Sequence, residues 1–121
     1  MQYQSTKTVH SHVFPHVRFT IRRVSFGRRL EFTRQVRSLG ERLEYLQAGE
    51  TATDKLDAAL LAAEINRLYL QWGLLCTEGL CIDGEAPDTE VLIERGPETL
   101  CHEILTAIKH EFGLTEEERK N

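Results

Sequence analysis

The sequence lacks any long apolar run and has few cysteines. No run approaches the roughly 20 residues that a membrane-spanning helix needs, and residues 1–8 are polar, unlike the core of a signal peptide. The three cysteines, Cys76, Cys81 and Cys101, are odd in number and form no CxxC pair, which argues against a disulfide framework or a zinc site. We therefore expect a protein that stays in the cytoplasm with reduced thiols.

Recognisable catalytic motifs are also missing. The sequence contains no P-loop, dinucleotide fingerprint or nucleophile elbow. The three histidines His10, His12 and His16 have the spacing HSHxxxH, which suits a metal site, but their polar terminal segment is more typical of a loose arm. We expect no enzyme activity and no catalytic, cofactor-binding or metal-binding residue.

The composition is that of one soluble globular domain, with 121 residues, 40% hydrophobic and 28% charged. The net charge of -4 is unevenly divided. Residues 1–48 carry nine Lys or Arg against three Asp or Glu, a balance of +6, whereas residues 49–121 carry six against sixteen, a balance of -10. Either the two halves attract each other, or a basic and an acidic face serve different partners.

We predict three segments: a flexible arm at 1–12, a single domain at 13–114 and an acidic tail at 115–121. At the start of the domain, apolar Val17, Phe19 and Ile21 alternate with polar residues, which predicts a strand with one cationic face. The tail residues Thr115–Glu118 have the form of a capping box, which normally opens a helix. The tail is either a frayed end or the start of a helix that an extension or a partner's surface continues.

The middle of the chain predicts two long helices. Ser25 suits the N-cap of the first, and Gly49 its end. The second runs from Asp54 to about Cys76, with Thr51 or Thr53 as its cap, and is apolar nearly all round. Such a helix either packs on two sides within its own domain or buries a face against another chain.

The last third predicts smaller elements. Asp83-Gly84 is a strong turn signal and predicts a small two-stranded ribbon within residues 77–86. A short helix at 89–95, capped by Asp88, and a longer one from Pro97 to about Phe112 follow. The predicted fold class is α+β, mainly helical, with an N-terminal strand and a small β-hairpin between helices.

A basic stretch near the N-terminus suggests nucleic-acid binding as an alternative function, because Arg-rich helices can grip phosphate. Against this, Phe19 and Phe26 fall in the apolar phase of their elements, and the acidic remainder would repel a polyanion. The arginines in question are Arg18, Arg22, Arg23, Arg28, Arg29, Arg34 and Arg37.

Residues 19–29, 62–74 and 78–85 resemble the tail assembly chaperones of long-tailed phages and prophages, and the layout is similar across nearly the whole chain. The resemblance implies a non-enzymatic protein that holds the helical tape measure protein while tail tube subunits polymerise around it, and then leaves. It implies the tape measure protein, and possibly the tail tube protein, as partners, and allows a homo-oligomer. A phage structural or connector component is a further alternative.

Many members of that family are made in two lengths by a ribosomal frameshift. Lys120-Asn121 can be encoded AAA-AAC, a run on which tRNAs can re-pair one base back. A helix that begins at Thr115 would then continue in the longer product.

The surplus apolar surface of the second long helix is the physical reason to expect a helical partner. For the apolar members of the candidate set, packing within the chain's own core is the alternative. The candidate partner-binding residues are Leu61, Ile65, Leu68, Tyr69 and Trp72, supported by Arg28, Arg29, Arg34 and Arg37.

Overall fold

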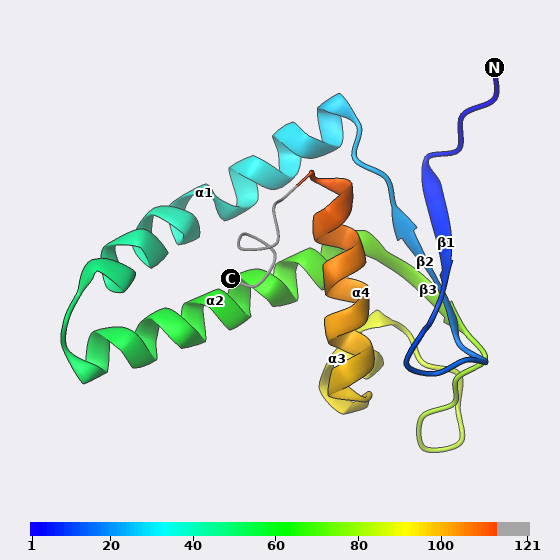
Figure 1. The fold of residues 1–121 in the computed structure, drawn as a ribbon. Helices are drawn as coiled ribbons and strands as arrows, with labels where there is room; N and C mark the ends of the chain where they lie inside the picture. The colour runs from blue at the N-terminus through cyan, green and yellow to red at the C-terminus, as the bar shows by residue number, and fades with distance from the viewer. Residues whose placement is uncertain (114–121) are drawn as a thin grey trace.

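The computed structural model describes residues 1–113 and confirms the α+β, mainly helical class. A three-stranded sheet lies beside the helices, and two long helices form a hairpin that extends away from it (Figure 1). Within residues 1–113 the elements are β1 (Thr6–His10), β2 (Arg18–Arg22), α1 (Phe26–Ala48), α2 (Ala52–Gly73), β3 (Leu74–Glu78), α3 (Thr89–Arg95) and α4 (Glu98–Glu111).

The sheet is antiparallel with β2 in the centre, in the order β1-β2-β3. Phe19 of β2 pairs with Val9 of β1 and with Thr77 of β3. Phe19 and Ile21 are buried in the core, whereas the intervening Thr20 and the flanking arginines are more exposed. The strand predicted from this alternation is confirmed.

The prediction of a flexible arm at residues 1–12 is partly wrong, because Thr6–His10 forms a strand at the edge of the sheet. The hydroxyl oxygens of Thr8 and Thr20 lie 3.0 Å apart across the β1–β2 pair. Beyond the strand, buried Ser11 donates to Glu103 Oε1 of α4 at 2.6 Å. Val9 is the one large apolar residue in this strand, so its sequence gave little sign of order.

The helix starts follow the predicted caps. The side chains of Ser25, Thr51 and Asp88 accept main-chain hydrogen bonds at the first turns of α1, α2 and α3. The predicted end of the second long helix near Cys76 is wrong: α2 stops at Gly73, and Leu74–Glu78 pairs with β2. From Leu74 on, main-chain pairing with β2, which is distant in the sequence, replaces the helical hydrogen bonds.

The predicted hairpin between the helices is confirmed. It consists of one bridge pair, Ile82 with Glu85, and is shorter than the predicted ribbon. Ile82 and Glu85 exchange main-chain hydrogen bonds of 2.8 and 3.1 Å. The turn residues Asp83 and Gly84 both have positive φ, 52° and 86°, as a two-residue hairpin turn requires.

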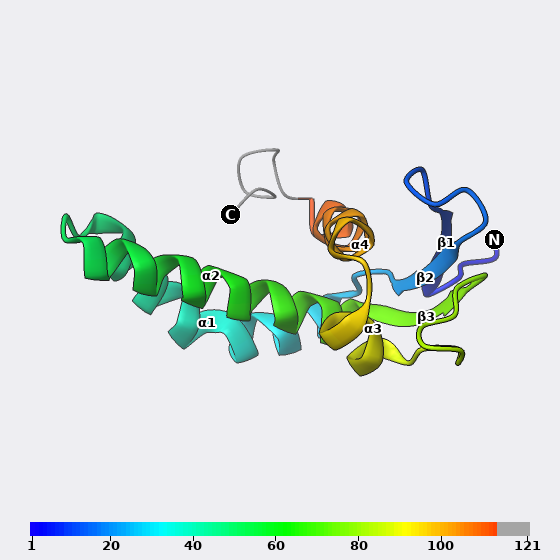
Figure 2. The ribbon, with the colours of Figure 1, turned by 90° about the horizontal axis from the view of Figure 1, so that it is seen from below.

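Two cores stabilise the fold. The main core joins the sheet to α2, α3 and α4, and it includes the aromatic rings of Phe32, Tyr69, Trp72 and Phe112, with centroids 4.6–5.5 Å apart. A smaller core of Leu46, Ala58 and Leu61 lies between the far halves of α1 and α2. In Figure 2, α1 and α4 lie on opposite sides of α2, and α4 covers only the half of α2 nearer the sheet.

Residues 114–121 lie outside the described residues. The predicted capping box at Thr115–Glu118, the Lys120-Asn121 pair and the end of the domain at residue 114 therefore remain predictions.

Candidate functional site

The helix α2 has two apolar faces, and they point in nearly opposite directions. The face toward α1 repeats at intervals of three or four residues and includes Ala58, Leu61 and Ile65 in the smaller core. The second face, which we call the outer seam, lies on the other side of the helix. It consists of Leu56, Leu60, Ala63, Arg67 and Leu70.

The outer seam is open over its first half. Leu56 is 63% exposed and Leu60 is 58% exposed, and Ala63 is also exposed. Only Leu70, at the end near the sheet, is buried. Leu56, Leu60 and Ala63 are about one turn apart on the same face, so a single partner helix could cover all three.

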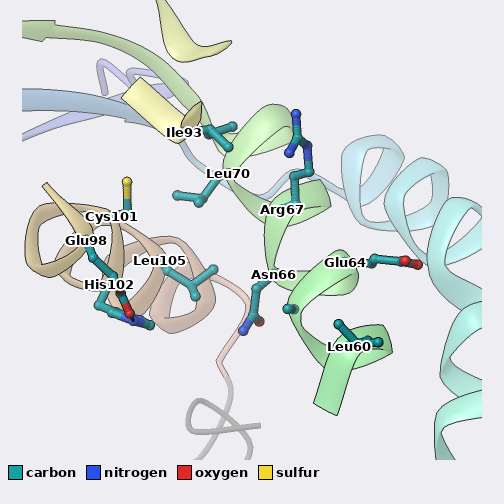
Figure 3. Close-up of a pocket in the computed structure, with 11 residues that line it drawn as sticks. Leu60, Glu64, Asn66, Arg67, Leu70, Ile93, Glu98, Cys101, His102 and Leu105 are labelled. Carbon is teal, nitrogen blue, oxygen red and sulfur yellow. Dashed lines mark hydrogen bonds and ion pairs between the residues drawn. The ribbon is translucent and has the colours of Figure 1, made fainter. Parts of the chain in front are cut away.

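A groove of about 460 Å³ between α2 and α4 continues the seam. In Figure 3, Leu70 of α2 and Leu105 of α4 point toward each other at its floor, and Ile93 of α3 lies at one end. Cys101 also lines the groove, where burial and then the charge of Glu98 raise the pKa of its thiol. The groove therefore continues the seam toward α4, with polar residues as well as apolar ones in its lining.

Arg67, the one charged residue of the seam, is held by α3. Its Nη2 lies 2.6 Å from Glu94 Oε1 and 3.3 Å from Glu90 Oε2. The hydrogen bond and charge of Glu94, with a smaller effect from Glu90, raise the pKa of this guanidinium. Gln71 Nε2 also donates to Glu90, at 3.0 Å. These contacts direct the cation toward α3, away from the open leucines.

Carboxylates dominate the surroundings of the seam. Glu98 of α4 lines the groove and lies 3.3 Å from His102 Nε2, while Asp57 and Glu64 are exposed on α2. The side-chain oxygen of Asn66, also at the groove, is buried with no hydrogen-bond partner among the described residues. The carboxylates around the seam are Asp57, Glu64, Glu90, Glu94 and Glu98. Of these carboxylates, Arg67 contacts only Glu90 and Glu94.

The five apolar candidates predicted from the sequence pack wholly or partly within the chain. Leu61 is 4% exposed in the smaller core, and Ile65 packs against it. Leu68, Tyr69 and Trp72 are partly buried against the main core. The structure thus favours core packing for these five, and Leu61 offers no free surface. The open residues Leu56 and Leu60 were not among the candidates, because both faces of α2 are apolar and spacing alone does not tell which face meets α1.

The basic candidates separate into two pairs. Arg28 Nη1 donates to the carbonyls of Ser5 and Arg23, and Arg29 donates to the carbonyl of Phe112. Arg34 is exposed, and Arg37 is exposed with a 3.4 Å ion pair to Glu41. Only Arg34 and Arg37 therefore present a basic surface away from main-chain carbonyls.

Other kinds of site receive little support from residues 1–113. In this range no three His, Cys, Asp or Glu side chains gather closely enough to hold a metal ion, so the HSHxxxH histidines form no such group. No helix here is both long and apolar enough to cross a membrane.

A scan against protein-family models and searches of curated proteins and of solved structures found no match to this chain.

Proposed function

We propose that this chain is a non-enzymatic tail assembly chaperone that holds the helical tape measure protein in the host-cell cytoplasm. The observation that carries the proposal is the exposure of Leu56 and Leu60 on the outer seam. A helix laid along this seam would bury both leucines and reach the groove at α4. Helix-in-groove recognition of this kind uses apolar anchors at intervals of three and four residues.

The small apolar area of the seam suits reversible binding. Fully burying an exposed leucine gives about 1.5–3 kcal/mol, and association costs at least about 4 kcal/mol in lost freedom. Two leucines and a shallow groove therefore support weak binding at each site. A chaperone that later leaves its partner is better served by many weak binding sites along a long helix than by one tight site, because weak contacts are released easily.

The use of the arginines supports protein binding over nucleic-acid binding. Arg22, Arg23, Arg28 and Arg29 donate to the main-chain carbonyls of Trp72, Thr6, Ser5 and Phe112, respectively. Arg18 forms an ion pair with Glu78. Side chains bound in this way stabilise the fold and are less available to phosphates.

Co-expression with the tape measure protein of the same tail module tests the proposal. We expect the tape measure protein to be soluble with the natural chain and to precipitate with the double variant Leu56→Glu/Leu60→Glu. The matched control is Tyr45→Glu/Leu75→Glu, which adds the same two charges at exposed apolar positions away from the seam. Precipitation with the natural chain, or equal solubility with both variants, would contradict the proposal.

The DNA that encodes residues 115–121 tests the associated expectation of a longer product. A slippery heptamer followed by an overlapping open frame would support it.

A further inference from the structure

We infer that the helix bound by the outer seam is a cationic amphipathic helix, chosen by the carboxylates that flank the seam. This inference rests on the proposed function and specifies the chemistry of its partner.

The spacing of the seam defines the shape of the partner. Leu56, Leu60, Ala63, Arg67 and Leu70 follow one another at intervals of four, three, four and three residues. This is the a/d repeat of a coiled coil, in which the residues of one helix insert between those of a second. The seam spans 15 residues from Leu56 to Leu70, or about 21 Å along the axis. Since α4 covers the end of the seam at Leu70, a partner helix would contact the open part from Leu56 to Ala63 over about two turns and then reach the groove.

One edge of the seam is acidic. Asp57 follows Leu56 directly and Glu64 follows Ala63, so both carboxylates lie on the same side of α2, one repeat apart. Both are exposed, and neither has an ion-pair partner among the described residues. In Figure 3, Glu64 points away from α4. Charges at such flanking positions set the choice and orientation of partners in coiled coils.

The other edge is mostly neutral, with one exposed cation, Lys55, directly before Leu56 at its start. Ala59 precedes Leu60, and Asn66 precedes Arg67, again one repeat apart. The small side chain of Ala59 on this edge lets a second helix approach closely beside Leu60. Farther along, Glu98 of α4 adds a carboxylate at the groove, and Arg67 is already held by two others. A partner therefore meets the carboxylates of Asp57 and Glu64, unpaired within residues 1–113, at the open part of the seam, and at the groove the carboxylate of Glu98, which contacts His102.

A second copy of the same face is a poor occupant. In an antiparallel pair of α2 helices, the acidic edges formed by Asp57 and Glu64 would face each other, and like charges at such positions repel. In a parallel pair, each acidic edge would face Ala59 and Asn66, which offer no cation. A helix with Lys or Arg beside its own apolar residues would pair with Asp57 and Glu64 in either the parallel or the antiparallel orientation.

Two synthetic helical peptides test the inference by fluorescence anisotropy. Both have leucines at the same four-three spacing over about 20 residues, and they differ only in Lys or Glu at the flanking positions. We expect the Lys peptide to bind at least about tenfold more tightly, with a preference that shrinks as salt is added. The variant Asp57→Lys/Glu64→Lys should reverse the preference. The control Glu44→Lys/Glu85→Lys changes the net charge equally at exposed positions away from the seam and should retain it.

Each contrary result is informative. Equal binding of both peptides, or a preference unchanged in Asp57→Lys/Glu64→Lys, would overturn charge selection and leave the proposed function standing if co-expression still solubilises the tape measure protein. Failure of both peptides to bind would overturn the inference. A dimer in light scattering that becomes monomeric in Leu56→Glu/Leu60→Glu would also overturn it, because a second copy would then occupy the seam.

Discussion

The guanidinium of Arg29 caps the end of α4 at Phe112. Both of its terminal nitrogens lie 3.3 Å from the Phe112 carbonyl oxygen, and its central carbon lies 5.4 Å from the centroid of the Phe112 ring. A cation at a helix C-terminus also interacts favourably with the helix dipole. Arg29 thus connects the start of α1 to the end of α4, although Arg29 and Phe112 are 83 positions apart in the sequence.

Removing this tie should destabilise the fold. We expect Arg29→Ala to lower the free energy of unfolding by about 1–2 kcal/mol, through the loss of the carbonyl hydrogen bonds and the cation–π contact. Arg29→Lys should recover less than half of the loss, because an ammonium lacks the planar fork that donates and stacks together. Urea denaturation measures both values. Full recovery by lysine, or no loss in alanine, would contradict the assigned role.

The neighbours Leu60 and Leu61 should respond in opposite ways to the same substitution. Leu61→Ala leaves a cavity in the smaller core and should cost about 2–4 kcal/mol of unfolding free energy. Leu60→Ala should change it by no more than about 0.5 kcal/mol, because Leu60 is 58% exposed. Thermal or urea unfolding of the two variants gives the comparison. A similar loss for both would mean that the outer seam is buried in the isolated protein.

The close approach of α2 and α4 depends on Gly73. A Cβ at this position would lie 2.8 Å from the Cδ1 and Cγ2 atoms of Ile108. Gly73→Ala should therefore destabilise the protein by about 1–3 kcal/mol. Combined with Ile108→Val, the loss should be smaller than the sum of the two single losses by at least about 0.5 kcal/mol.

Gly27→Ala is the matched control for Gly73→Ala, since nothing lies within 4 Å of its Cβ position in α1. There we expect a small gain from helix propensity. Strict additivity of Gly73→Ala and Ile108→Val would show that the clash is relieved elsewhere.

Lys109 should make stability depend on alkaline pH. Its side chain is buried, with the ammonium 5.2 Å from the centroid of the Tyr69 ring, and burial lowers the pKa of Lys109 below its ordinary 10.5. The unfolded chain then holds this proton more tightly than the folded one, so stability rises with pH between the lowered pKa and 10.5. Below both values the contribution of Lys109 does not change with pH.

Comparison with Lys109→Met isolates this contribution. The unfolding free energy of the natural chain minus that of the variant should increase as pH rises toward 10.5. The exposed Lys55→Met serves as the control and should show no such trend. A difference that stays flat or falls over this range would contradict the effect of burial.

The sequence predicted those parts of the fold that local signals determine. Ser25 and Asp88 cap helices through hydrogen bonds three residues away, and Asp83-Gly84 makes its turn without distant partners. The strand β3 was missed because Leu74 and Leu75 continue the apolar pattern of α2, and only pairing with β2 makes them a strand.

The sequence indicated α2 as the candidate helix, and the choice of exposed residues on it depends on the structure. The surplus apolar surface of α2 was evident from its composition, yet both faces are apolar, and periodicity alone does not tell which one meets α1. The structure assigns Leu61 to the inner face and Leu60 to the outer one. That distinction depends on the tertiary packing of α1 and α4 against α2.

Amide hydrogen exchange of the chain, alone and in complex with the tape measure protein, tests most directly whether a partner helix binds the open face of α2. We predict that protection increases in the first half of α2, around Leu56–Ala63, and in α4 beside the groove, while the exposed start of α1 at Phe26 and Leu30 stays unchanged. Protection that increases at the start of α1 but not in α2 would contradict the proposed binding face.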